Sequence, residues 1–113
     1  MSAEYYLSKG YTPSTKTIVI SGPNTITVWA PVSGKRVVMT GVSFSNINAG
    51  TIAFYFDHPS EIKIAEYLLA ASSTIEPMIG AWESTVVGGR IFARVGASGT
   101  DGWRVNATGF ELG

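Results

Sequence analysis

The 113-residue chain has no cysteine, one histidine and few charged residues. The lack of cysteine excludes a disulfide scaffold and any metal site built on thiolates. Charged side chains make up 14% of the residues, whereas they make up about 25% of an average globular domain. A soluble domain with so few charges has to cover its surface in another way, and burial against other protein surfaces is the simplest. The composition therefore predicts a module that assembles or binds.

The chain also lacks an excess of charge of either sign, and it lacks long hydrophobic runs. Eight basic and eight acidic residues cancel, and no basic patch is evident, so we expect no nucleic-acid partner. No apolar run approaches the ~20 residues that span a bilayer, so we expect no membrane partner. The first sixteen residues lack the charged start and apolar core of a signal peptide. We therefore expect assembly in the cytoplasm of the producing cell.

Reactive side chains are scarce. His58 follows Asp57 and precedes Pro59, a pattern typical of a turn residue whose imidazole faces solvent. A Ser–His–Asp triad and a metal site formed with Asp57 and Glu61 are the alternatives, but neither has the spacing of a recognisable site. The remaining acidic residues are scattered, mostly near expected turns. We therefore expect no catalytic residue, no cofactor and no bound metal.

What the chain does contain is a succession of short β-branched and aromatic runs punctuated by Gly and Pro. The run at 17–21 is expected to form a hairpin with 25–29 around Gly22-Pro23-Asn24, and the run at 51–57 to pair with 36–46. Residues 61–71 fit a strand followed by a loop, with a short helix as the alternative. Further strands are expected at 73–77, 90–95 and 103–112. This spacing predicts an all-β fold, an antiparallel β-sandwich or jelly-roll-like domain over residues 17–113.

Residues 1–16 show no sustained period and are expected to form an extended N-terminal arm, with a frayed terminus as the alternative. The arm has large side chains whose apolar area is unfavourable when exposed to water. We expect four of them to bind a neighbouring subunit: Tyr5, Tyr6, Leu7 and Tyr11. Deleting residues 1–12 is then expected to weaken binding while leaving the melting behaviour of the domain nearly intact.

A second group of residues is expected to contribute contacts with other subunits or with a partner surface: Trp29, Met78, Trp82 and Trp103. The three tryptophans could alternatively form a platform on which sugar rings stack.

From residue 35 to residue 112 the order of elements resembles small structural proteins of tailed bacteriophages. The motifs are a strand ending in Ser-Asn (45–46), an Ala-Gly-Thr turn (49–51), a Leu-Ala-Ala step (69–71), a Gly-Gly pair (88–89) and a closing Gly-Phe-Glu-Leu (109–112). The resemblance implies a virion component of the capsid decoration (cement) type. Such proteins are non-enzymatic, often trimeric, and bind the major capsid protein on the outer surface of the head. A homo-oligomer, with a trimer favoured, is therefore expected.

Two other classes of function stay open at this point. A tail, fibre or host-recognition module would expose its tryptophans in a carbohydrate-binding groove. A small enzyme would depend on His58 and on individual acidic residues.

Overall fold

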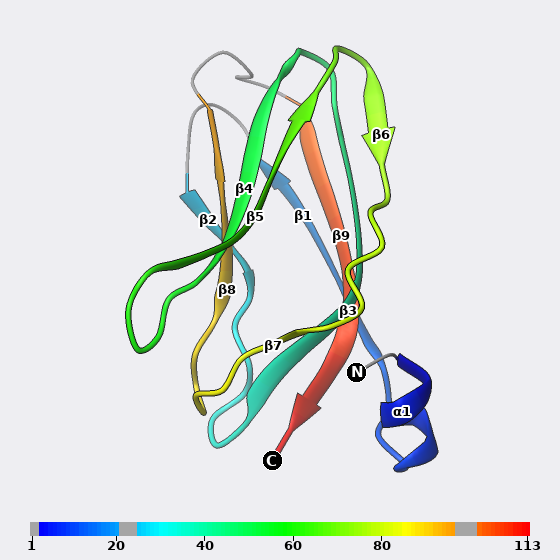
Figure 1. Ribbon diagram of the computed structural model, residues 1–113, viewed down its shortest axis with the longest axis vertical. Helices are drawn as coiled ribbons and strands as arrows, with labels where there is room; N and C mark the ends of the chain where they lie inside the picture. Colours follow the sequence, from blue (N-terminus) through cyan, green and yellow to red (C-terminus); the bar gives the residue numbers. More distant parts are fainter. Residues whose placement is uncertain (1–2, 21–24, 97–101) are drawn as a thin grey trace.

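Two antiparallel sheets pack face to face in the computed structural model, which describes residues 3–20, 25–96 and 102–113 (Figure 1). This confirms the predicted all-β sandwich. A single turn-and-a-half helix, α1 (Ala3–Ser8), precedes the first strand. The turns expected at 22–24 and 96–102 lie wholly or mostly outside the described residues. No helix in the described ranges is long and apolar enough to cross a bilayer.

The strand order in both sheets is that of a jelly roll. Sheet A contains, in spatial order, β1 (Ser14–Ile20), β9 (Trp103–Leu112), β3 (Arg36–Asn46) and β6 (Ser73–Ile75), and the short β7 (Trp82–Glu83) also pairs with β3. Sheet B contains β2 (Thr25–Trp29), β8 (Ile91–Val95), β4 (Gly50–Phe56) and β5 (Ile62–Leu69). Residues 61–71 thus include a strand, as predicted, and not a helix.

Two of the expected strand pairings are wrong. β1 pairs with β9, with Ile20 opposite Trp103, and β2 pairs with β8 in the other sheet. Likewise β3 and β4 lie in different sheets, so they do not form a hairpin. The physical reason is that alternation tells which side chains share a face but not which strand lies alongside. Each of these connections crosses from one sheet to the other, and β4 with β5 forms a true hairpin.

The core lies between the sheets and is filled by large side chains from both. Phe44 of β3 and Phe54 of β4 meet with ring centroids 5.5 Å apart, and Phe54 lies 5.2 Å from Trp82. Trp29 is buried, and its indole Nε1–H donates to Glu111 Oε2 at 2.9 Å, which satisfies the polar end of the ring. The interior is therefore rich in aromatic side chains.

The burial of the three tryptophans corrects their expected role as surface contacts. Trp29 and Trp103 are at most 1% exposed, and Trp82 is 9% exposed. Large apolar rings contribute most to stability when removed from water, and inward positions on the strands place them in this interior. Their burial also rules out a sugar-stacking platform made of these rings.

At Gly109 of β9 the backbone of β3 occupies the space that a side chain would need. The register between them shifts between Met39 and Gly41, and a glycine inside a strand is typical of such an irregularity. A Cβ built on Gly109 would lie 2.1 Å from the carbonyl oxygen of Val38. Only a residue without a side chain fits at this point of the sheet.

The N-terminal segment is not an extended arm. Tyr6 of α1 is 2% exposed and packs on the outer face of sheet A, against Val38, Phe110 and Leu112. Figure 1 shows α1 beside the C-terminal end of β9. An isolated helix of six residues is unstable in water, so α1 depends on this packing. Because a sheet face with Val38 and Phe110 needs a cover, the segment folds back on its own domain.

Candidate functional site

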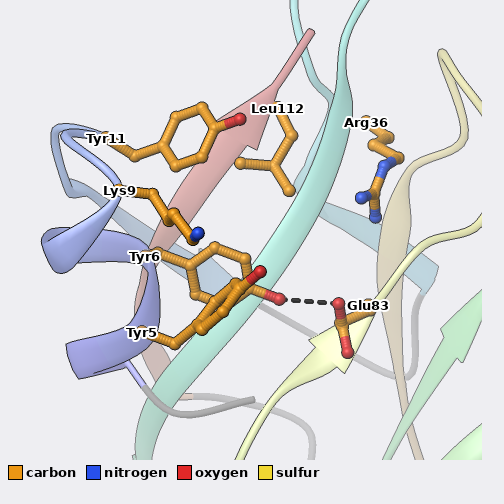
Figure 2. Close-up of a pocket in the computed structure, with 7 residues that line it drawn as sticks. All are labelled: Tyr5, Tyr6, Lys9, Tyr11, Arg36, Glu83 and Leu112. Carbon is orange, nitrogen blue, oxygen red and sulfur yellow. Dashed lines mark hydrogen bonds between the residues drawn. The ribbon is translucent and has the colours of Figure 1, made fainter.

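A pocket of about 530 Å³ lies between α1 and the outer face of sheet A (Figure 2). We call it the α1 pocket. Its lining combines three aromatic rings, one aliphatic side chain and three charged groups: Tyr5, Tyr6, Lys9, Tyr11, Arg36, Glu83 and Leu112. The helix and its following turn supply the first four residues, and β3, β7 and β9 supply the others.

Tyr6 forms the floor of the α1 pocket. Its ring lies 5.2 Å from that of Phe110, and its hydroxyl donates to Glu83 Oε1 at 2.6 Å. Burial, and after it the hydrogen bond to the Glu83 carboxylate, raise the pKa of Tyr6 to about 12. The phenol therefore stays protonated at neutral pH and acts as a permanent donor that links α1 to β7.

The end of α1 brings Tyr11 back over the pocket. Gly10 has a φ of +85°, a left-handed conformation that ends helices and favours glycine. The amide of Tyr11 donates to the carbonyl oxygen of Tyr6 at 3.1 Å, which closes this turn. As a result Tyr5 and Tyr11 stand on either side of Tyr6, with ring centroids 5.1 and 6.4 Å from it.

Two cations face the pocket from different walls. The Lys9 ammonium lies 5.6 Å from the centroid of the Tyr5 ring. The Arg36 guanidinium donates from Nη1 to the carbonyl oxygen of Ser84 at 3.2 Å. Figure 2 shows the two side chains extending from opposite sides. Within the described ranges of the chain neither of them forms an ion pair, so positive charge dominates the mouth of the pocket.

The residues predicted for the arm are thus brought together, but in a different arrangement. Tyr5, Leu7 and Tyr11 are 39%, 50% and 39% exposed, while Tyr6 is buried beneath them. Met78 is fully exposed and borders a separate hollow of about 420 Å³ that Ala3 also lines. The exposed members remain predicted contact residues.

Sequence reasoning missed the charged members of the site. Lys9 follows Tyr5 by four residues, which is the spacing of neighbours on one helix face, so a helical interpretation of residues 3–8 would have found it. Arg36 and Glu83 carry no such signal, because only the pairing of β3 with β7 brings them beside α1.

The histidine considered for catalysis belongs to an ion network near one end of sheet B. Asp57 Oδ1 lies 2.8 Å from His58 Nδ1 and accepts the Arg90 amide at 2.8 Å, while Oδ2 accepts Arg90 Nε at 2.7 Å. Burial acts to raise the pKa of Asp57, but the hydrogen bonds from His58 and Arg90 outweigh it and lower the pKa below 3.8. Both carboxylate oxygens are therefore used in holding β4 to β8.

The part of the chain that the structure describes contains no group of three or more His, Asp or Glu side chains placed to hold a metal ion. The expectation that the protein has no cofactor and no catalytic residue remains a prediction.

Comparison with known proteins gives a fold likeness alone. No family model and no curated protein matches the chain. Among solved structures, the chain is similar to one from work titled "Bacillus endospore appendages form a novel family of disulfide-linked pili", with 12% identity, a TM-score of 0.48 and 91% of each chain covered. At this identity and score we draw no functional conclusion from the likeness.

Proposed function

We propose that this chain is a non-enzymatic structural subunit of a tailed-bacteriophage particle. In this proposal it is a capsid decoration protein that forms a homo-oligomer, with a trimer favoured, and binds the major capsid protein on the outer surface of the head. The observation that carries the proposal is the segment of α1 and the turn after it, which is held to its own domain by Tyr6 yet presents Tyr5, Leu7 and Tyr11 to solvent. The resemblance of residues 35–112 to phage structural proteins supplies the kind of partner.

The exposed side chains of α1 are of the kind found in protein interfaces. Interface cores are enriched in aromatic residues and depleted in charge, and a few buried anchors contribute most of the binding energy. Tyrosine and leucine that stay half exposed on a packed helix lose little conformational freedom on binding, because the helix is already ordered. The arrangement favours a surface that binds protein.

The uncovered part of the outer face of sheet A supports the same function. Cross-strand register places a set of small polar side chains on this face: Thr15, Thr17, Ser43, Ser45, Asn106 and Thr108. Arg104 contributes a charge to these rows. A sheet face with small side chains permits close approach of another protein surface.

Sheet B differs from the outer face of sheet A, because it carries several ion pairs. Three ion pairs lie on or next to β4, β5 and β8: Asp57 with Arg90, Glu61 with Arg94, and Lys63 with Glu66. These mutually paired charges thus lie on the side of the molecule away from α1. We infer that sheet B faces solvent in the particle, while α1 and sheet A face the capsid.

Fractionation of particles tests the proposal. A tagged chain is expressed in the cell that produces the phage, and intact heads are separated from free protein on a density gradient. We expect the chain to sediment with the heads, and tail fractions to lack it. Recovery of the chain only as free monomer would contradict the function, and recovery in tail fractions alone would place it in the tail.

Paired variants locate the binding surface. Leu7→Asp introduces a charge on α1 and is expected to lower occupancy on heads by about tenfold, which corresponds to ~1.4 kcal/mol. Leu68→Asp is the control, because Leu68 lies on β5 of sheet B and is 76% exposed. Both variants should keep the melting temperature of the parent. Equal occupancy of the two variants would remove α1 from the binding surface.

A further inference from the structure

We infer that the α1 pocket binds an acidic peptide segment of the partner protein, in which an Asp or Glu carboxylate stands next to an aromatic or aliphatic side chain. The inference rests on the proposed function and adds the chemistry that the partner has to provide. Three features of the pocket carry it: an excess of positive charge, aromatic walls and a size that fits one side-chain pair.

The net positive charge of the pocket lining favours binding of one anionic group. Its lining has two cations, Lys9 and Arg36, and one carboxylate, Glu83. The carboxylate accepts the Tyr6 hydroxyl at 2.6 Å, so it is part of the floor. One additional carboxylate would bring the lining to neutrality and would accept charge-assisted hydrogen bonds from Lys9 and Arg36. Hydroxyl groups of Tyr5 and Tyr11 are further donors at the rim.

The apolar surface of the pocket walls favours binding of an apolar group beside that anion. Tyr5 and Tyr11 are each 39% exposed, and Leu112 lines the wall formed by β9. A ring or aliphatic chain inserted between them would remove this area from water, which contributes about 25 cal/mol per Å² of apolar surface. A volume of about 530 Å³ lies in the range of ligand pockets.

A carboxylate fits this site better than the phosphates of a nucleic acid. Nucleic acids are held by rows of Lys and Arg that follow the backbone, whereas the α1 pocket has two cations on opposite walls. The rows of sheet A next to the pocket continue with Thr, Asn and Ser side chains, and Arg104 follows only further along β9. The site is therefore suited to a single anionic group.

A titration followed by NMR tests the inference on the full chain labelled at its tyrosines. The probe is the blocked tripeptide acetyl-Leu-Glu-Tyr-amide, and the comparison peptides carry Gln or Lys in place of Glu. We expect the resonances of Tyr5, Tyr6 and Tyr11 to shift with the Glu peptide and to stay unchanged with the other two. Equal shifts with the Gln peptide would show that no carboxylate is recognised and would overturn the inference.

Two variants of matched charge follow. Lys9→Gln is expected to weaken binding of the Glu peptide about fivefold, as for loss of one partly solvated charge-assisted hydrogen bond. Lys63→Gln removes the same charge from sheet B, where Lys63 pairs with Glu66, and should leave binding unchanged. Equal effects of the two variants would indicate that only the net charge of the protein attracts the peptide, and would contradict binding in the α1 pocket. Inorganic phosphate serves as a competitor, and displacement of the peptide by low millimolar phosphate would overturn the assignment to a carboxylate.

These outcomes separate the inference from the proposed function. In one outcome, sedimentation with heads depends on Leu7 but not on Lys9, and the peptide does not bind. This outcome would contradict an acidic partner segment but would agree with the proposed function. Binding of the Glu peptide by a chain that never sediments with particles would leave the site standing and remove the phage function.

Discussion

At the scale of single residues, long-range side-chain hydrogen bonds help to set the positions of the elements. The Tyr6 hydroxyl on Glu83 anchors α1, the Trp29 indole on Glu111 ties β2 to β9, and the Asp57 carboxylate ties β4 to β8. In each pair a residue near the end of one strand or helix bonds to a residue more than 30 positions away. Loss of Glu83 or Glu111 is expected to be costly, because the buried Tyr6 hydroxyl or the buried Trp29 indole would then lose its acceptor.

Asp57 gives a prediction on pH. Its pKa in the folded protein is below the ordinary 3.8, so the stability that it contributes is present above the unfolded pKa and is lost as the pH falls through the folded pKa. We expect Asp57→Asn to lower the free energy of unfolding at pH 7 by about 1–2 kcal/mol and to flatten its fall below pH ~4. Urea unfolding at several pH values measures both effects.

The control for this prediction is Glu66→Gln, which breaks an exposed pair with Lys63. Exposed ion pairs contribute little, so a loss under about 0.5 kcal/mol is expected at pH 7. A loss for Asp57→Asn no larger than that of the control would contradict the structural role of Asp57.

At the scale of elements, α1 shows that a short helix can be both part of the core and part of a surface. Tyr6 lies on the sheet side, and Tyr5 and Leu7 lie on the solvent side. This changes the expectation for deleting residues 1–12. Because the deletion uncovers Val38, Phe110 and Leu112, it should destabilise the domain as well as weaken binding.

Point variants of α1 separate the two roles. We expect Tyr6→Ala to lower the free energy of unfolding by about 3–5 kcal/mol, since it removes a buried ring, and Tyr6→Phe by about 1 kcal/mol, since only the hydrogen bond to Glu83 is lost. Tyr5→Ala, at a half-exposed position, should cost less than about 1 kcal/mol. Chemical denaturation measures all three. Similar losses for Tyr5→Ala and Tyr6→Ala would contradict the docking of α1 through Tyr6.

β5 shows how an element at the edge of a sheet avoids unwanted pairing. The register between β4 and β5 shifts between Phe54 and Tyr55, and β5 carries the charged pair Lys63 and Glu66. Bulges and charges on edge strands hinder pairing with other chains. The edge of sheet B is thus protected, in keeping with the inference that contacts are made by α1 and sheet A.

At the scale of the whole molecule, the jelly-roll order ties the two ends of the chain together. β9, the last strand, lies between β1 and β3 and pairs with both along most of its length. Damage at this place should therefore unfold the entire domain and not a local segment.

A substitution at Gly109 tests whether damage to β9 unfolds the entire domain. In Gly109→Ala the new Cβ would clash with the backbone of β3, which cannot move away as a side chain could. We expect a loss of about 3 kcal/mol or more, at the upper end of overpacking effects, seen as a lower midpoint in a single cooperative transition. Gly113→Ala is the control, since its Cβ would meet only the Lys35 side chain at 3.8 Å. A near-normal midpoint for Gly109→Ala would contradict the close approach of β3 and β9.

The sequence by itself determined the fold class and most strand positions, because strand alternation and turn residues act over a few positions of the chain. It also determined the shortage of charge and the group of tyrosines near the N-terminus. Only the tertiary structure decided which strands pair, that the tryptophans lie inside, and that Tyr6 docks on sheet A with Lys9, Arg36 and Glu83 around it. These depend on which faces remain to be covered once both sheets have formed, and local sequence patterns do not contain that information.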